Sequence, residues 1–123
     1  MKPAPEFTPD VMNEMCASRR LLSDVTSKWG ILVMLALQGG TMRFSTLRRR
    51  IGGVSEKMLS QTLKTLEADG FVARRSFEVV PPHVEYSLTE HGMELALHLR
   101  SLVTWLEGAL PNLPLGQELL SRD

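Results

Sequence analysis

Glycines at three points divide the middle of the chain into short apolar segments. The pairs Gly39-Gly40 and Gly52-Gly53 and the single Gly70 each follow hydrophobic residues at helical spacing. Glycine is the residue most often found just past the end of a helix. The sequence therefore predicts successive helices over residues 29–37, 45–51 and 55–69. A chain of 123 residues is long enough for one such domain with its own core.

The segments around these glycines carry further helix signals. Thr8-Pro9-Asp10 is typical of a helix start, and it predicts a helix over residues 9–27, in one or two pieces. Residues 29–37 are apolar on nearly every side, which indicates a helix buried in the core. Ser45 and Ser55 are the expected N-caps of the two helices that follow. The helix over residues 55–69 should bury one leucine stripe and expose a polar face.

After Gly70 the pattern changes from helical spacing to short alternating runs. Residues 71–77 and 83–88 are rich in β-branched and aromatic residues and predict a β-hairpin, with Pro81-Pro82 between the strands. Thr89 is the expected cap of a last long helix that ends at Leu110-Pro111. The predicted fold class is mainly α with a small β-hairpin wing, which is a winged helix-turn-helix.

The domain organisation follows from the same pattern. We expect residues 1–8 to form a flexible N-terminal arm, residues 9–110 to form the winged helix-turn-helix domain, and residues 111–123 to form a C-terminal tail. That tail is predicted to hold no more than one weak turn of helix, around Leu119. The turn of the motif falls at residues 52–54, and residues 55–69 are the predicted recognition helix.

Charge is distributed unevenly along a chain whose net charge is zero. Residues 43–76 carry eight basic and three acidic residues, a net +5, and the remainder of the chain is −5. Neutrality alone would argue against a nucleic-acid partner, but a local positive segment attracts phosphate by releasing condensed counterions. Around a helix-turn-helix, this segment predicts double-stranded DNA as the partner.

The candidate DNA-binding residues are the polar and basic side chains of this region and of the hairpin. Gln61 can pair with adenine, Lys57 or Lys64 with guanine or phosphate, and the serines and arginines with backbone phosphates. The sequence does not decide which of them read bases. Arg74, Arg75 and His83 are expected near the hairpin tip, where they would reach the adjacent groove or backbone. The full set is Arg43, Ser45, Arg48, Arg49, Arg50, Ser55, Lys57, Ser60, Gln61, Lys64, Arg74, Arg75 and His83.

Several segments together resemble the HxlR family of transcriptional regulators, a winged-helix group similar to the MarR regulators. The matching segments are Cys16 and residues 28–29, 43–48, 51–55, 58–63, 66–72 and 81–92. The resemblance spans roughly residues 16–107 and implies a homodimer that binds an operator with an inverted repeat. It also implies dimerisation through the first and last helices, which carry apolar residues beyond one core stripe. The candidate interface residues are Val11, Met15, Leu22, Leu99, Leu102, Val103, Trp105 and Leu106.

Cys16 is the candidate sensor of oxidants or electrophiles. Members of the family often have Cys followed by Pro at this position, whereas this chain has Cys16-Ala17. Without the proline, the helix from Pro9 is expected to run unbroken through Cys16, which would place the thiol away from a helix N-terminus. Arg19 and Arg20, one turn further on, would favour the thiolate. A buried, inert cysteine and a regulator that responds to a non-redox ligand remain alternatives.

Other classes of function lack sequence support. One cysteine excludes an internal disulfide, and there is no nucleophile-elbow or phosphate-loop motif, so we expect no enzyme activity and no cofactor. His91 and His98 lack further ligands, so no metal is expected. The longest apolar run, residues 31–37, is too short to span a membrane, and no signal peptide is evident, which favours the cytoplasm. A protein-binding adaptor is the remaining alternative, but it has no need for the +5 segment.

Overall fold

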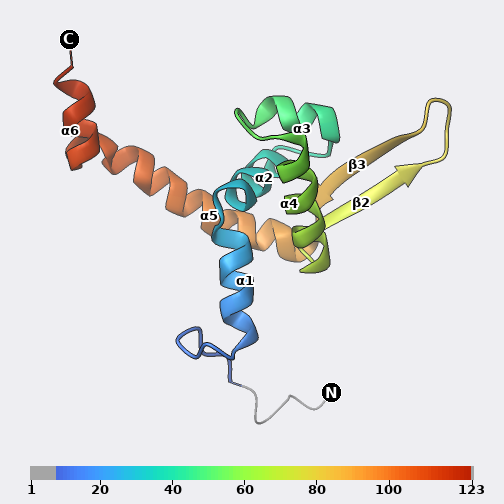
Figure 1. Cartoon of the computed structure of the whole chain (residues 1–123), viewed down its shortest axis with the longest axis horizontal. Coiled ribbons are helices and arrows are strands. Elements are labelled where there is room, and N and C mark those ends of the chain that lie inside the picture. Colours follow the sequence, from blue (N-terminus) through green and yellow to red (C-terminus); the bar gives the residue numbers. More distant parts are fainter. Residues whose placement is uncertain (1–7, 123) are drawn as a thin grey trace.

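The computed structural model describes residues 8–122 and consists of a small helical body from which several segments project (Figure 1). These are the β-hairpin, the first helix, and the second half of the long helix with the C-terminal helix at its end. The elements are α1 (Ala17–Thr26), α2 (Lys28–Gln38), β1 (Met42–Arg43), α3 (Phe44–Arg50), α4 (Glu56–Ala68), β2 (Val72–Phe77), β3 (His83–Leu88), α5 (Glu90–Ala109), the 3-10 helix η1 (Leu110–Asn112) and α6 (Pro114–Leu120). The predicted winged helix-turn-helix is confirmed.

Helix α2 lies at the centre of the core, as its all-round apolar sequence predicts. It contacts α1, α3, α4, β3 and α5, and the side chains of Val33 and Met34 are fully buried. The other elements each place one apolar stripe against it. Their buried residues are Leu47 of α3, Leu59, Leu63 and Leu66 of α4, Val72 of β2, and Ala96 and Leu99 of α5. Burying these side chains, at about 1.5–3 kcal/mol each, holds the short helices in place.

Helix α4 begins and ends as its sequence indicates. The Ser55 hydroxyl accepts a hydrogen bond from the Met58 amide at 3.0 Å, and so caps the helix. Gly53 in the preceding turn has φ +86°, and Gly70 after the helix has φ +90°. A side chain is disfavoured in this left-handed conformation, so glycine permits both sharp turns. The expected cap of the shorter helix was wrong, because α3 begins at Phe44 and its N-cap is Arg43.

The sheet contains one strand more than the sequence predicted. Its order is β1-β3-β2, and the two-residue β1 pairs antiparallel with β3. Two residues are too few to show an alternating pattern, so only their pairing identifies them. The predicted hairpin is confirmed, with Val72 opposite Leu88 and Phe77 opposite His83. Pro81 and Pro82 lie in the connection, outside the ladder of hydrogen bonds.

Helix α5 is anchored at one end only. The Thr89 hydroxyl accepts from the Gly92 amide at 3.0 Å and donates to the Gly70 carbonyl at 2.6 Å, so it joins the start of α5 to the end of α4. The buried residues Gly92, Ala96 and Leu99 all belong to the first half of the helix. Beyond them α5 leaves the body, as Figure 1 shows. The C-terminal tail holds the seven-residue helix α6, more than the single turn expected.

The N-terminal helix is shorter than predicted. It begins at Ala17, and residues 11–15 form turns, so the expected helix from Pro9 through Cys16 was wrong. Two local hydrogen bonds explain the difference. The Asp10 side chain accepts from the Met12 amide, and the Asn13 side chain accepts from the Met15 amide. Such Asx turns compete with the helical backbone. Across residues 8–122, no helix is both long and apolar enough to span a bilayer.

Candidate nucleic-acid interface

The outward face of α4 carries a polar stripe opposite its leucines. Lys57, Gln61 and Lys64 are exposed and follow one another at i, i+4 and i+7. Leu59 and Leu63, on the other side, are buried in the core. Residues at this spacing lie on one face of a helix, so all three polar side chains point away from the body together. Ser60, also predicted as a contact, is half-buried beside this stripe.

Helix α3 places a basic cluster beside the start of α4. Arg48, Arg49 and Arg50 form its last turn and are all exposed. Cations at a helix C-terminus are stabilised by the helix dipole. The Arg48 guanidinium lies 3.7 Å from the Glu56 carboxylate in the first turn of α4. This exposed pair adds little stability, but it brings the basic cluster next to the polar stripe.

The wing adds basic residues in its strands and none at its tip. Arg43 and Arg75 stand on either side of Glu85 in the register of the three strands. The Arg75 guanidinium also lies 4.7 Å from the centre of the Phe77 ring, which stacks on His83. Alternation along the strand directs Arg74 to the opposite face.

The expected position of the wing arginines needs correction. Both lie in the middle of β2, four and three residues from its connection to β3, and not at the hairpin tip. The connection itself, residues 78–82, contains no basic residue, and Val80 is 99% exposed there. Only His83 lies beside the tip, where its Nε2 is 3.3 Å from the Glu85 carboxylate.

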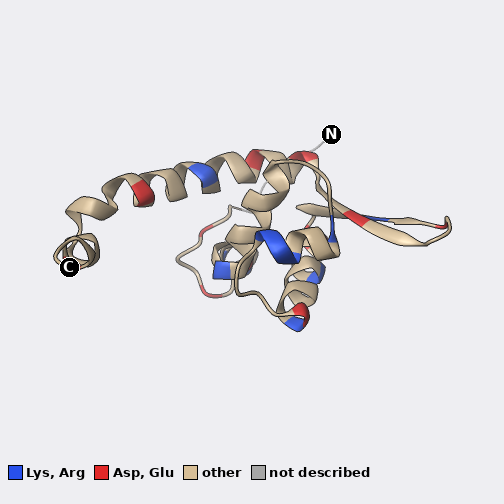
Figure 2. Ribbon diagram, turned by 90° about the horizontal axis from the view of Figure 1, so that it is seen from above, with Lys and Arg blue, Asp and Glu red and all other residues tan. Residues whose placement is uncertain are grey.

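Positive charge is therefore concentrated on one part of the molecule. Figure 2 shows most of the blue lysine and arginine segments in the body and the wing, below the long arm of α5 and α6, with some red acidic segments among them. That arm is mostly neutral and acidic, with Glu90, Glu94 and Glu107 against Arg100 on α5. The basic residues of the +5 segment thus lie on α3, α4 and the strands of the wing, with Arg74 on the opposite face of β2 from Arg75.

The carboxylate of Asp24 in α1 lies beside that of Asp69, the C-cap residue of α4. Burial and, after it, the neighbouring Asp24 carboxylate together raise the pKa of Asp69 to about 6, whereas Arg20 opposes the rise. One oxygen of each carboxylate is inaccessible to solvent and has no hydrogen-bond partner within the described part of the chain. No local pattern in the sequence signals this pair, because its members are 45 positions apart, one in α1 and the other at the C-cap of α4.

Cys16 is the N-cap of α1, which corrects its expected mid-helix position. Its Sγ accepts hydrogen bonds from the Ser18 hydroxyl at 3.1 Å and the Asp10 amide at 3.4 Å. These bonds lower the pKa of the thiol, chiefly through Ser18. The expected help from Arg19 is not seen, because its guanidinium binds the carbonyls of Val11 and Met12. The thiol is partly exposed.

The candidate interface residues divide into exposed and buried ones. Trp105, Leu106 and Leu102 are 63%, 45% and 44% exposed on the free half of α5. Val103 is half-buried, and Val11, Met15 and Leu22 are exposed near the other end of the chain. Leu99 is an exception, because it is part of the core and cannot contact a partner. The sequence interpretation missed the exposed leucines of α6, Leu115, Leu119 and Leu120.

A short helix, a tight turn, a second helix with a polar outer face and a β-hairpin define the winged helix-turn-helix class of DNA-binding proteins. Within that class, the chain belongs to the HxlR-like helix-turn-helix family, whose family model matches residues 24–113. The uncharacterized HTH-type transcriptional regulator YtfH of Escherichia coli (strain K12) is 56% identical over 98 residues, which cover 80% of this chain and 78% of YtfH. The chain is accordingly an HTH-type transcriptional regulator and not an enzyme.

Solved structures show the same likeness. The structure of ytfH from Salmonella typhimurium has a TM-score of 0.83 and 50% identity, and the match covers 90% of this chain and 99% of that one. The oxidized form of the redox regulator HypR has a TM-score of 0.70 and 35% identity, with 76% and 96% covered.

Proposed function

We propose that the chain binds a specific inverted-repeat operator as a homodimer and regulates transcription from it. The observation that carries the proposal is the exposed stripe of Lys57, Gln61 and Lys64 on a helix whose other face is fixed in the core. A major groove about 12 Å wide accepts a helix presented in this way. The amide of Gln61 can form two hydrogen bonds with an adenine edge, and each lysine can bind guanine or phosphate.

The surrounding basic residues would position this helix on the duplex. Arg48, Arg49 and Arg50 lie where the backbone beside the groove would pass, and Ser45 and Ser55 can donate to phosphate oxygens. Such contacts supply affinity that does not depend on sequence. Arg43, Arg74, Arg75 and His83 would bind the neighbouring groove or backbone through the wing. Because the wing arginines lie in mid-strand, we expect the flank of the hairpin, rather than its tip, to face the DNA.

Dimerisation would set the spacing of two such helices. The free half of α5 exposes Trp105 and Leu106, and α6 adds Leu120, which is 70% exposed. An apolar surface of this kind gains free energy when a second copy covers it. A two-fold axis there would present the two α4 helices to two half-sites of one operator, whose centres would lie one or more helical turns of DNA apart. Such an axis requires the operator to be an inverted repeat.

The test begins with an operator selected from a pool of randomised duplexes with the full-length protein. Mobility shifts at physiological salt then compare the selected duplex with a shuffled duplex of equal length, and sedimentation gives the number of chains bound. We expect preferential binding, with two chains per duplex. Equal binding to both duplexes would overturn operator specificity. Binding to neither would favour a protein-binding adaptor, and one chain per duplex would overturn the homodimer.

A thiol response at Cys16 is a second proposal, favoured by the N-cap position and the lowered pKa of this residue. The thiolate is the reactive form of cysteine, and the positive end of the helix dipole at a helix N-terminus favours it. HypR, which this chain resembles, is named a redox regulator. With one cysteine per chain, diamide would take two electrons and two protons from the Cys16 thiols of two chains and leave one disulfide between them.

The Cys16 proposal is tested with diamide and the Cys16→Ser variant. We expect diamide to produce a disulfide-linked dimer on a non-reducing gel and to change the operator affinity of the wild type. The Cys16→Ser variant should show neither change. An equal response of the variant, or no response of the wild type, would show that Cys16 is not a switch.

A further inference from the structure

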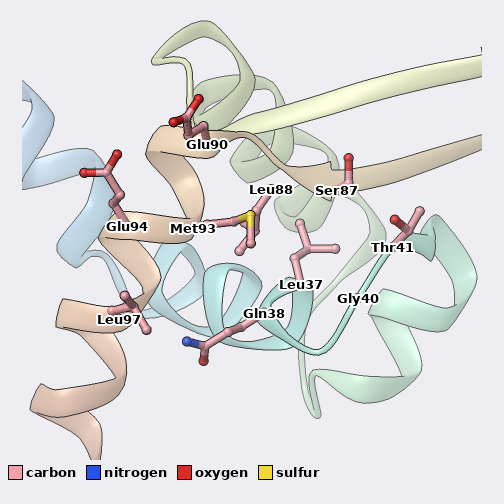
Figure 3. Close-up of a pocket in the computed structure, with 10 residues that line it drawn as sticks. All are labelled: Leu37, Gln38, Gly40, Thr41, Ser87, Leu88, Glu90, Met93, Glu94 and Leu97. Carbon is pink, nitrogen blue, oxygen red and sulfur yellow. The ribbon is translucent and has the colours of Figure 1, made fainter.

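A cavity of about 500 Å³ is lined by residues of α2, β3 and α5. It opens between the C-terminal end of α2, the base of the wing and the first half of α5 (Figure 3). Sites for small molecules generally measure about 300–1,000 Å³, so the cavity is large enough for one. None of the residues that the sequence predicted as DNA contacts lines it.

The wall of the cavity is apolar and partly uncovered. The side chains of Leu37, Leu88 and Met93 converge at its floor, and Leu97 continues the wall along α5, as Figure 3 shows. Leu37 is buried, whereas Met93 and Leu97 are 61% and 66% exposed. These two side chains are one helical turn apart, so a ligand lying along α5 would cover both and remove apolar surface from water.

The polar groups at the rim favour one sign of charge. Glu90 and Glu94, also one turn apart on α5, both line the cavity. No lysine or arginine of the described residues lines it, and neither glutamate forms a salt bridge within residues 8–122. Arg100 does not line the cavity, but its guanidinium donates to the side chain of Gln38, a lining residue, at 3.1 Å.

We propose that this cavity binds a small lipophilic cation, with an apolar body on the leucine and methionine wall and a positive charge beside Glu90 and Glu94. Charge complementarity selects the occupant, because an anion would meet two carboxylates. Thr41, Ser87 and Gln38 supply further hydrogen-bonding groups.

The place of the cavity gives such a ligand access to the DNA-binding region. Thr41 immediately precedes β1 with Arg43, and Ser87 belongs to β3, which pairs with both other strands. A ligand there touches the base of the wing and α5 together. It would change operator affinity to the extent that it binds the free and DNA-bound forms differently. This effector role rests on the proposed operator binding, whereas the binding of the cation does not.

The binding test uses tetraphenylphosphonium, a lipophilic cation, and tetraphenylborate, an anion of nearly the same size and shape. Calorimetric titration of the full-length protein without DNA should show the cation binding at least about tenfold more tightly, a difference of about 1.4 kcal/mol. The Glu90→Gln, Glu94→Gln double variant should weaken binding of the cation about fivefold or more. The matched control, Glu67→Gln with Glu107→Gln, makes the same charge change outside the cavity and should leave binding unchanged.

Binding of neither ion, equal binding of both, or an equal loss in the control would overturn the proposal. The exposed residue Leu97 provides a second variant, since Leu97→Asn should weaken binding of the cation without unfolding the protein. If Leu97→Asn instead dissociates a dimer in sedimentation, the wall is covered by a second copy and the proposal is wrong. A mobility shift with the operator, measured without the cation, tests DNA binding separately. Failure of cation binding can therefore be distinguished from failure of operator binding.

Discussion

Helices α4 and α5 both pack one face against the core but expose different surfaces. α4 buries Leu59, Leu63 and Leu66 along its whole length, and its uncovered face carries lysine, glutamine and serine. α5 buries Ala96 and Leu99 in its first half, and its second half exposes tryptophan and leucine. The first surface is suited to phosphate and base edges, and the second to another apolar surface.

The comparison shows that helical periodicity identifies the apolar face of a helix but does not show how much of that face packs against the core. Leu95, Leu99, Leu102 and Leu106 continue one spacing along α5, but the body of the protein ends part-way along that row. Leu99 meets the core, whereas Leu106 is 45% exposed. The following predictions test this difference, and the difference from α4, in order of decreasing effect.

The largest effect is expected for Leu99→Ala. Removing a buried leucine side chain leaves a cavity in the core and should lower the free energy of unfolding by about 2–5 kcal/mol. Leu106→Ala, on the same row beyond the core, should lower the stability of the monomer by much less. Denaturant unfolding at several protein concentrations separates folding from association. Equal losses for the two variants would contradict the distinction between the halves of α5.

Trp105→Ala should act on association instead of folding. A large exposed aromatic side chain at an interface often contributes about 2 kcal/mol, so the dimer dissociation constant should rise about thirtyfold. Sedimentation equilibrium measures this constant. Lys64→Ala on α4 is the control and should leave it unchanged. If Trp105→Ala leaves the dimer intact, the interface lies elsewhere on the molecule.

Gln61→Ala should separate sequence reading from phosphate binding on the α4 side. Loss of a bidentate contact to a base costs about 1–3 kcal/mol, and it should relax specificity at one position of the operator. Arg49→Ala should weaken binding to all duplexes alike and reduce the salt dependence. Mobility shifts over a range of salt concentrations distinguish these outcomes. The same loss of specificity in both variants would argue against α4 as the recognition helix.

The smallest effect concerns the pair of carboxylates, Asp24 and Asp69, where α1 meets the end of α4. The pKa of Asp69 is raised to about 6 from an ordinary value of 3.8, so the folded protein holds this proton more tightly than the unfolded chain. The stability that the protonated Asp69 contributes to folding is fully present at low pH and is lost as the pH rises from about 4 through about 6. Asp69→Asn should therefore reduce the fall in melting temperature over this range. Asp24→Asn should do the same, because it removes the neighbouring charge.

Much of the site could be predicted from local patterns, and the rest could not. Ser55 as a cap and the i, i+4, i+7 spacing of Lys57, Gln61 and Lys64 are local, so the sequence was enough to predict α4 and its polar face. The turns before Cys16 depend on hydrogen bonds from backbone amides to the side chains of Asp10 and Asn13. The spacing of apolar residues, from which the helix was predicted, carries no information about these bonds. The expected helix through Cys16 was wrong for that reason.

The sequence by itself determined the order of the main helices and the hairpin, the glycine turns between them and the segment that carries the positive charge. These depend on neighbours within a few positions, where backbone geometry and side-chain spacing decide the outcome. Only the tertiary structure decided that Leu99 is core and Leu106 is surface, that Asp24 meets Asp69, and that α2, β3 and α5 enclose a cavity. Those features depend on which segments, distant in the sequence, come into contact. The close packing of the whole chain determines these contacts.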